Sequence, residues 1–382
     1  MGADISKEID SLRTGTAARK RRATRRLADL AYDGFNKRTI VNEGGVVPLV
    51  DLLKSRDREC RSNAVFALAM LSEESKNRQA VVREGGVAAL VRLLAYGDDR
   101  DKACAARALG MIGADDQANK DAIRAEGGIP MLVRMLNSGS QMSCNQAAMA
   151  LASISAGVGD SSLKSVIGPE GGIPPLVKML TSSDELSRMW ATIILSHVAD
   201  DAVNRKEIID EGGVKLLVRQ LASSFEVARL NAASTLAQLA ERDSQVQTAI
   251  SEEGAIPSLI AMLADKNDVC REQAAMVLDL LTGSQDLASE VISEGAVPPI
   301  LVLLGSKCEY CRICGSCVLA NLSSYEVGCS AIVYADGIRP LVELLVTAEE
   351  ESRWNALCTL ANVAHNSVDD RLSIIRLLAF PC

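Results

Sequence analysis

One short phrase recurs eight times along the chain at a nearly constant interval. It reads NEGGVVPLVDLL at residues 42–53, REGGVAALVRLL at 83–94 and SEGAVPPILVLL at 293–304. Successive phrases lie 41 to 44 residues apart, measured between their second small residues, which are Gly45, Gly86, Gly128, Gly172, Gly213, Ala255, Ala296 and Gly337. A period of this size indicates a solenoid, in which each repeat buries its apolar face against its neighbours.

Each repeat predicts three helices. A short helix, such as 77–84, runs into the small-residue pair, where glycine supplies the left-handed conformation that ends a helix. A second helix follows, with a proline near its first turn in six repeats, at a position that needs no N–H donor. A third helix, as at 231–241, is longer and rich in alanine. One column of these third helices holds only alanine or glycine, which would let neighbouring helices approach closely: Ala64, Ala105, Ala147, Ala191, Ala232, Ala274, Gly315 and Ala356.

A repeat of this length, with one short and two longer helices and the phrase GG(I/V)PxLVxLL, resembles the armadillo-repeat family. The chain is similar to the yeast vacuolar armadillo protein and to plant armadillo-repeat proteins, and more distantly to importin alpha and beta-catenin. The resemblance implies an all-α fold, a right-handed α-solenoid (superhelix) of about eight three-helix repeats with partial capping units. We expect a solenoid at 17–379, divided into a partial unit at 17–36, repeats from about 37 to 368 and a capping helix at 369–379. An N-terminal segment at 1–16 and a tail at 380–382 would flank it.

The composition restricts the classes of function. The net charge is −8, so direct nucleic-acid binding has no support from the overall charge. No stretch approaches 18 consecutive apolar residues and no apolar signal segment opens the chain. These features favour a cytoplasmic location, with nuclear or membrane-peripheral alternatives. The eleven cysteines are then expected to be mostly reduced thiols.

The segment CEYCRICGSC at 308–317 raises the question of an iron–sulfur site. Its four cysteines are spaced three apart, close to the ligand pattern of ferredoxins. Along a helix, however, each step of three residues rotates the side chain by about −60°, so the thiols would spiral around the axis. Three of them also occupy repeat columns that hold single cysteines elsewhere. We therefore expect no metal and no cofactor, and interpret the thiols as buried or groove-lining, with a metal or redox site as the alternative.

No catalytic constellation is evident in the sequence. The two histidines, His197 and His365, fall in third-helix regions of different repeats, and spacing brings no cysteine or carboxylate pair to either. The glycine pairs lack the Lys-Ser/Thr that follows a phosphate-binding loop. We expect a protein without enzymatic activity and without catalytic residues.

The resemblance also implies where partners bind, because third helices of armadillo arrays line a concave groove that holds extended peptides. Three columns share one face of each third helix, since they lie 18, 21 and 25 residues after the second small residue. Amides in these columns both donate and accept hydrogen bonds, and aromatic and arginine residues commonly dominate binding energy. The candidate groove residues are Asn63, Phe66, Arg107, Gln146, Trp190, His197, Asn231, Gln238, Gln273, Asn321, Asn355 and Asn362. Other residues of these columns, Met70, Met111 and Leu280, are interpreted as core or groove floor.

One branch of the family provides a test of this register. Importin alpha carries a ladder of tryptophans in column 21 and of asparagines in column 25. In this chain no tryptophan stands in column 21, and asparagine stands in column 25 only at Asn321 and Asn362. A nuclear-import adaptor is therefore the less favoured interpretation.

The N-terminus suggests a further alternative. MGADIS matches M-G-x-x-x-[ST], which makes Gly2 a candidate lipidation site, and the basic run at 19–26 could supply a second membrane signal. The chain would then be an acylated peripheral membrane tether, similar to the yeast vacuolar protein. No cysteine follows Gly2 closely, so a second acyl group has no acceptor. The same basic run could act as a nuclear address.

The favoured interpretation is a non-enzymatic scaffold or adaptor for protein–protein interaction. Its partners would be other proteins that lay extended segments in the groove. We expect no direct contact with nucleic acid, membrane contact only if Gly2 is acylated, and a monomer or weak oligomer.

Overall fold

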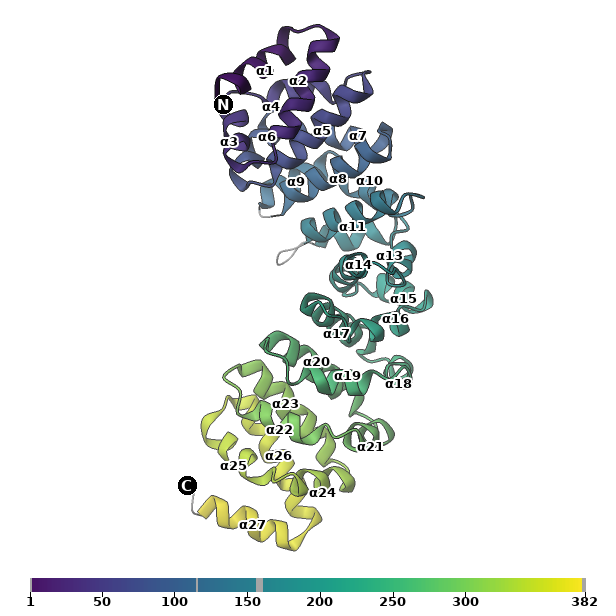
Figure 1. The fold of residues 1–382 in the computed structure, drawn as a ribbon. Coiled ribbons are helices and arrows are strands. Elements are labelled where there is room, and N and C mark those ends of the chain that lie inside the picture. Colours follow the sequence, from purple (N-terminus) through teal and green to yellow (C-terminus); the bar gives the residue numbers. More distant parts are fainter. Residues whose placement is uncertain (1, 115, 156–160, 380–382) are drawn as a thin grey trace. The chain divides into compact units, whose positions relative to one another are not determined.

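A computed structural model of the chain describes residues 2–114, 116–155 and 161–379. Over these residues the regular structure is entirely α-helical, and the helices follow one another as a solenoid (Figure 1). Contacts divide the chain into an N-terminal half, ending at Asn204, and a C-terminal half, beginning at Arg205. The tail predicted at 380–382 lies outside the described residues.

The N-terminal half opens with two capping helices and then repeats short, second and third helices. The capping helices are α1 (Gly2–Thr14) and α2 (Ala17–Leu30). The short helices are α3 (Gly34–Asn42), α6 (Ser75–Arg83), α9 (Gln117–Ala125) and α12 (Ser161–Ile167). The second helices are α4 (Val46–Leu52), α7 (Gly86–Tyr96), α10 (Gly128–Leu136) and α13 (Ile173–Met179). The third helices are α5 (Arg58–Ser72), α8 (Asp99–Gly113), α11 (Gln141–Ser155) and α14 (Glu185–Val198).

The C-terminal half continues the same order. Its short helices are α15 (Ala202–Asp210), which begins before the boundary, α18 (Ser244–Glu252), α21 (Gln285–Ser293) and α24 (Glu326–Tyr334). The second helices are α16 (Gly213–Gln220), α19 (Ala255–Met262), α22 (Val297–Leu304) and α25 (Ile338–Thr347). The third helices are α17 (Glu226–Ala240), α20 (Asp268–Leu281), α23 (Glu309–Ser323) and α26 (Glu350–Asn366), and α27 (Val368–Ala379) packs against α26.

Each short helix ends on a residue with left-handed backbone, as predicted. Seven glycines take this conformation, with φ between +70° and +82°. A Cβ added at Gly85 would meet nothing within 4 Å, so the requirement there is conformational rather than steric. In the last repeat Asp336 takes the position with φ 56°, which fits the tolerance of aspartate for this region.

The third helices of each half stack side by side and form the core of the array. The alanine column is fully buried, as at Ala105, Ala147 and Ala232. A close approach occurs at Gly110 of α8, where an added Cβ would lie 2.8 Å from the Cα of Ala150 in α11. Small residues therefore set the distance between neighbouring repeats.

The array begins before the predicted boundary at residue 17. Helix α1 packs on α2 and buries Ile5, Ile9 and Leu12, which recur at helical spacing on one face. Arg26 of α2 also contacts Glu8 of α1, with 2.5 Å between Nη1 and Oε1. Residues 2–14 are thus part of the N-terminal cap and not a separate segment.

An arginine near the start of most third helices binds the loop before it. Arg61, for example, donates from Nη1 to the Ser55 carbonyl at 3.1 Å, and Arg312 donates to the Ser306 carbonyl at 2.6 Å. Corresponding bonds come from Arg188, Arg229, Arg271 and Arg353. In the third repeat Cys144 takes this place, and its Sγ lies 3.1 Å from the Ser138 carbonyl. These side chains satisfy loop carbonyls that the helices leave unpaired.

No single helix within the described ranges is long and apolar enough to cross a membrane. In the described part of the chain one pair, α21 and α22, reaches the required length and apolarity together, and it is bent by 89° at the break between the helices.

Candidate functional site

The six candidate groove residues of the N-terminal half lie on α5, α8, α11 and α14. All are half-buried except His197, which is exposed. Phe66 packs against Tyr32, with 5.5 Å between ring centroids, so it already has an aromatic neighbour within the array. Trp190 is half-buried on α14 and remains the larger aromatic surface of this face.

Arg107, expected to contribute strongly to partner binding, forms an ion pair with Glu73 inside the array. Its Nη2 lies 2.6 Å from Oε1 of Glu73, and the other oxygen of Glu73 lies 2.6 Å from the Lys37 ammonium. The Arg107 side chain is 39% exposed, so part of it remains accessible. Binding of a partner carboxylate there would have to compete with Glu73.

Polar atoms of three other candidates point inward. The Asn63 Nδ2 and the Gln146 Oε1 are buried and make no hydrogen bond to the described residues. His197 Nδ1 lies 2.8 Å from the Ser155 hydroxyl. Although part of the His197 side chain is exposed, burial of the ring, with the charge of Lys120, lowers the pKa of His197 and favours its neutral form at pH 7.

In the C-terminal half three of the six predicted amides, those of Asn321, Asn355 and Asn362, bind neighbouring third helices. Asn321 of α23 donates to Asp279 of α20 at 2.9 Å, and Asn362 of α26 donates to the Ser323 hydroxyl at 3.0 Å. Asn355 donates to Ser316 at 3.2 Å, and Asn231 is 9% exposed and donates to the carbonyl of Val227 in its own helix. The amides of Asn321, Asn355 and Asn362 therefore connect neighbouring helices, and that of Asn231 binds its own helix, so these four already have partners within the array.

A cavity of about 410 Å³ opens on the third-helix face of the C-terminal half. It is formed by three successive third helices, α17, α20 and α23, and it includes two predicted residues, Gln238 and Gln273. The other lining residues, which were not among the candidate contact residues, are Ser234, Ala237, Glu241, Met276, Asp279, Leu280, Cys314 and Cys317. Of these, Leu280 was interpreted as core or groove floor and the two thiols as buried or groove-lining. We call this space the third-helix cavity.

Asp279 is the most unusual residue of the third-helix cavity. It is half-buried and accepts the hydrogen bond from Asn321, and no ion pair involves it in the described parts of the chain. Burial raises the pKa of Asp279 to about 6, because an apolar environment disfavours the charged carboxylate. A comparison of repeat columns could have found it, since Asp279 stands in column 24, which is otherwise small.

The four-cysteine segment forms part of a continuous helix. Cys308 precedes α23, Cys311 is buried, and Cys314 and Cys317 line the third-helix cavity. No group of three or more potential metal ligands comes together within the described residues. Burial raises the pKa of Cys314 to about 12 and that of Cys317 to about 11. Both thiols are therefore protonated at neutral pH, although they border an open cavity.

We predict that Cys314 and Cys317 react slowly with iodoacetamide at pH 8. Because the thiolate is the nucleophile, a rise of pKa from 9 to about 11 lowers its fraction on the order of 100-fold. Peptide mass spectrometry of the native chain would follow both sites, with N-acetylcysteine in the same solution as reference. Alkylation of either site at a rate comparable to that of N-acetylcysteine would contradict the raised pKa values of Cys314 and Cys317.

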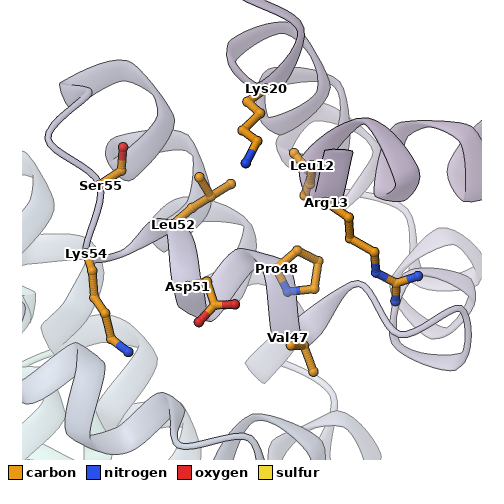
Figure 2. A pocket seen from close by; sticks show the side chains of 9 residues that line it. All are labelled: Leu12, Arg13, Lys20, Val47, Pro48, Asp51, Leu52, Lys54 and Ser55. Carbon is orange, nitrogen blue, oxygen red and sulfur yellow. The ribbon is translucent and has the colours of Figure 1, made fainter. Parts of the chain in front are cut away.

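A second cavity, of about 460 Å³, lies in the N-terminal half between α1, α2 and α4 (Figure 2). Lys20 points into the space between Leu12 and Leu52, whereas Arg13 and Lys54 lie at separate edges. Arg13 also donates to the carbonyl of Gly44 at 3.2 Å. The cationic groups therefore do not converge on one anion position.

The predicted basic run is partly neutralised by the array itself. Arg21 pairs with Asp57 at 2.5 Å, Arg25 with Glu59 at 3.2 Å, and Arg26 with Glu8. Arg19 and Arg22 are exposed. Gly2, the candidate lipidation site, is the first residue of α1.

Comparison with known proteins establishes the family. The model of the plant U-box protein ARM repeat region matches residues 4–221 and 89–304, so two overlapping matches together span most of the chain. The chain belongs to the armadillo-repeat family. No curated protein gives a significant match.

Two solved structures of engineered proteins are similar to this armadillo array. The first is 31% identical, with a TM-score of 0.81, and the alignment covers 98% of this chain and 92% of that protein. The second is 33% identical, with a TM-score of 0.56, over 62% of this chain and 97% of that protein. Both come from the Northeast Structural Genomics Consortium. The predicted α-solenoid of armadillo repeats is thereby confirmed.

Proposed function

We propose that this armadillo protein is a non-enzymatic scaffold that binds extended segments of partner proteins along its third helices. The observation that carries the proposal is the third-helix cavity, because it is open, bordered by three consecutive repeats and lined by both apolar and polar side chains. Such a mixture is typical of binding sites, in which apolar walls supply affinity and a few polar groups supply orientation.

The repeating geometry supports an extended ligand. A residue in an extended chain spans about 3.3 Å, so alternate side chains can follow successive helices of a regular array. Gln273 of α20 stands at the cavity, and its primary amide can both donate and accept. Gln238 of the adjacent α17 already donates to the Ser234 hydroxyl at 3.5 Å, and its Oε1 is buried. An extended segment that crosses α17, α20 and α23 would present its backbone to the Gln273 amide.

Photo-crosslinking tests this proposal. A display library of random 12-residue peptides would be selected on the immobilised full chain, and enriched peptides would be resynthesised with a photoreactive group. We expect crosslinks on α17, α20 and α23. Crosslinks confined to short or second helices would overturn the proposal.

A matched pair of variants controls for nonspecific effects. Gln273→Ala with Met276→Ala removes two side chains from the cavity wall, and should weaken binding at least tenfold. Gln285→Ala with Val302→Ala removes the same amide and an exposed apolar side chain from α21 and α22, outside the cavity, and should leave affinity unchanged. Equal affinity of the two variants for the selected peptides would contradict binding at the third-helix face.

A further inference from the structure

An acidic residue stands where every other repeat has a small one. Asp279 lies 24 residues after Ala255, and the same column in the other repeats holds only alanine, glycine or serine: Ala69, Gly110, Ala152, Ser196, Ala237, Ala320 and Ala361. Packing of neighbouring helices therefore does not require an aspartate at this position. A half-buried carboxylate is costly unless it gains a partner, so its presence calls for a separate explanation.

The surroundings of Asp279 supply one hydrogen bond and no cation. Asn321 donates from Nδ2 at 2.9 Å, but none of the residues that line the third-helix cavity is lysine or arginine. The other titratable groups of the wall are Glu241 of α17 and the thiols of Cys314 and Cys317 of α23. Glu272, about two turns before Asp279 on α20, adds a further acidic group on that helix. The cavity wall itself therefore carries no cation, and the nearby Arg242 is directed to Glu241, with 4.0 Å between Nε and Oε1.

The C-terminal half as a whole also carries a net negative charge. From residue 205 to the end, the sequence contains 14 Lys/Arg and 24 Asp/Glu, a net charge of −10. A negative field of this kind attracts cationic segments and repels acidic ones. The pKa of about 6 for Asp279 also shows that its charged form lacks compensation in the free chain.

We propose that the third-helix cavity receives a lysine or arginine side chain of the bound segment, with Asp279 as its counter-ion. This inference rests on the proposed function, since it names one side chain of the extended partner. The cavity walls suit such a side chain along its whole length. Met276 and Leu280 offer apolar contact for the methylene stem, and the carboxylate of Asp279 receives the charged end.

Other occupants fit these groups less well. An apolar side chain would remove the remaining water from Asp279 without replacing it, and an acidic side chain would be repelled. The cavity is also unlike the tryptophan and asparagine ladder of importin alpha, because it provides one counter-ion at one position and has no tryptophan in its wall.

Peptide selection on three proteins tests the inference. The random 12-residue library would be selected on the wild-type chain, on Asp279→Asn, and on Asp286→Asn, which makes the same charge change at an exposed position in α21. We expect lysine or arginine to be enriched several-fold at one peptide position by the wild type and by Asp286→Asn. Selection on Asp279→Asn should lose that enrichment.

A double-mutant cycle then measures the coupling between the charge of the peptide lysine and that of Asp279. Replacing the selected lysine by norleucine should weaken binding to the wild type about tenfold, within the range measured for close interfacial charge pairs, and should change binding to Asp279→Asn less than twofold. Lowering the pH from 8 to 5 should weaken binding to the wild type and not to Asp279→Asn, because protonation of Asp279 removes its charge while lysine keeps its own.

The outcomes distinguish this inference from the proposed function. Peptides that lose affinity for the Gln273→Ala, Met276→Ala variant, yet show no basic preference and no coupling to Asp279, would overturn the inference and leave the scaffold function standing. Peptides insensitive to all cavity variants, or the absence of any enriched peptide, would overturn both.

Discussion

Replacing Gly110 by leucine should destabilise the region around α8 and α11 by about 3 kcal/mol, although leucine is the better helix former. Helix propensity alone would favour leucine by about 1 kcal/mol. At this position, however, an added Cβ would lie 2.8 Å from the Cα of Ala150 and 3.1 Å from its Cβ. The contact is with backbone, so α8 and α11 would have to separate, and overpacking in a buried interface outweighs propensity.

Hydrogen exchange would localise this effect. Amides of α5, α8 and α11 should lose protection, whereas amides of α20, α23 and α26 should keep theirs, because each repeat is stabilised by its neighbours. Gly139→Leu is the matched control, since Gly139 is exposed and an added Cβ there would meet nothing within 4 Å. Uniform loss of protection along the chain would contradict nearest-neighbour stability, and unchanged protection would contradict the close helix approach.

Replacing Arg61 by methionine should cost about 3 kcal/mol, because it leaves the buried carboxylate of Asp101 without its cation. Arg61 Nε lies 2.7 Å from Asp101 Oδ2, and the Asp101 side chain is fully buried. Ser62 donates to the other carboxylate oxygen at 2.5 Å, so one hydrogen bond would remain. The substitution also removes the Arg61 bond to the Ser55 carbonyl.

The same helix offers a matched exposed pair. Arg58 lies 2.7 Å from Asp98, but its side chain is 75% exposed, so Arg58→Met should cost less than about 1 kcal/mol. Exchange rates of α5 and α8 amides would compare the two variants. Adding Asp101→Ser to Arg61→Met should recover most of the loss, since serine fills the same column at Ser143, Ser187 and Ser352. Equal costs for Arg58→Met and Arg61→Met, or no recovery in the double variant, would contradict the buried-charge explanation.

The repeat pattern was sufficient to predict the order of the helices and the left-handed ends of the short ones, although the third helix predicted at 231–241 begins earlier, at Glu226. A phrase that returns every 41 to 44 residues specifies the short, second and third helices, and the small-residue pairs specify the left-handed stops. The partial capping unit at 17–36 was predicted, but the packing of α1 on it was not, because α1 has no counterpart of the repeated phrase. The helical spacing of Ile5, Ile9 and Leu12 in α1 predicts one apolar face, but the surface that this face covers is provided by α2 and α3 in the tertiary structure.

The candidate site was predicted less completely. The column register led to Gln238 and Gln273, which do line a cavity, because residues three and four apart share a helix face. It could not tell that Asn321, Asn355 and Asn362 donate to neighbouring helices, because those bonds join residues 39 to 42 apart in the sequence. Asp279 was visible as an exception to its column and was missed, because the column itself does not belong to the predicted face.

By itself, then, the sequence determined the period, the order and approximate positions of the helices, and the family, since these depend on local propensity and on spacing that repeats. Only the tertiary structure decided which polar groups are already satisfied and which are not. Arg107 is paired with Glu73, whereas Asp279 is half-buried beside a cavity whose wall includes no lysine or arginine. The physical reason is that the energy of a charge depends on burial and on partners one repeat away, and the linear order of residues specifies neither.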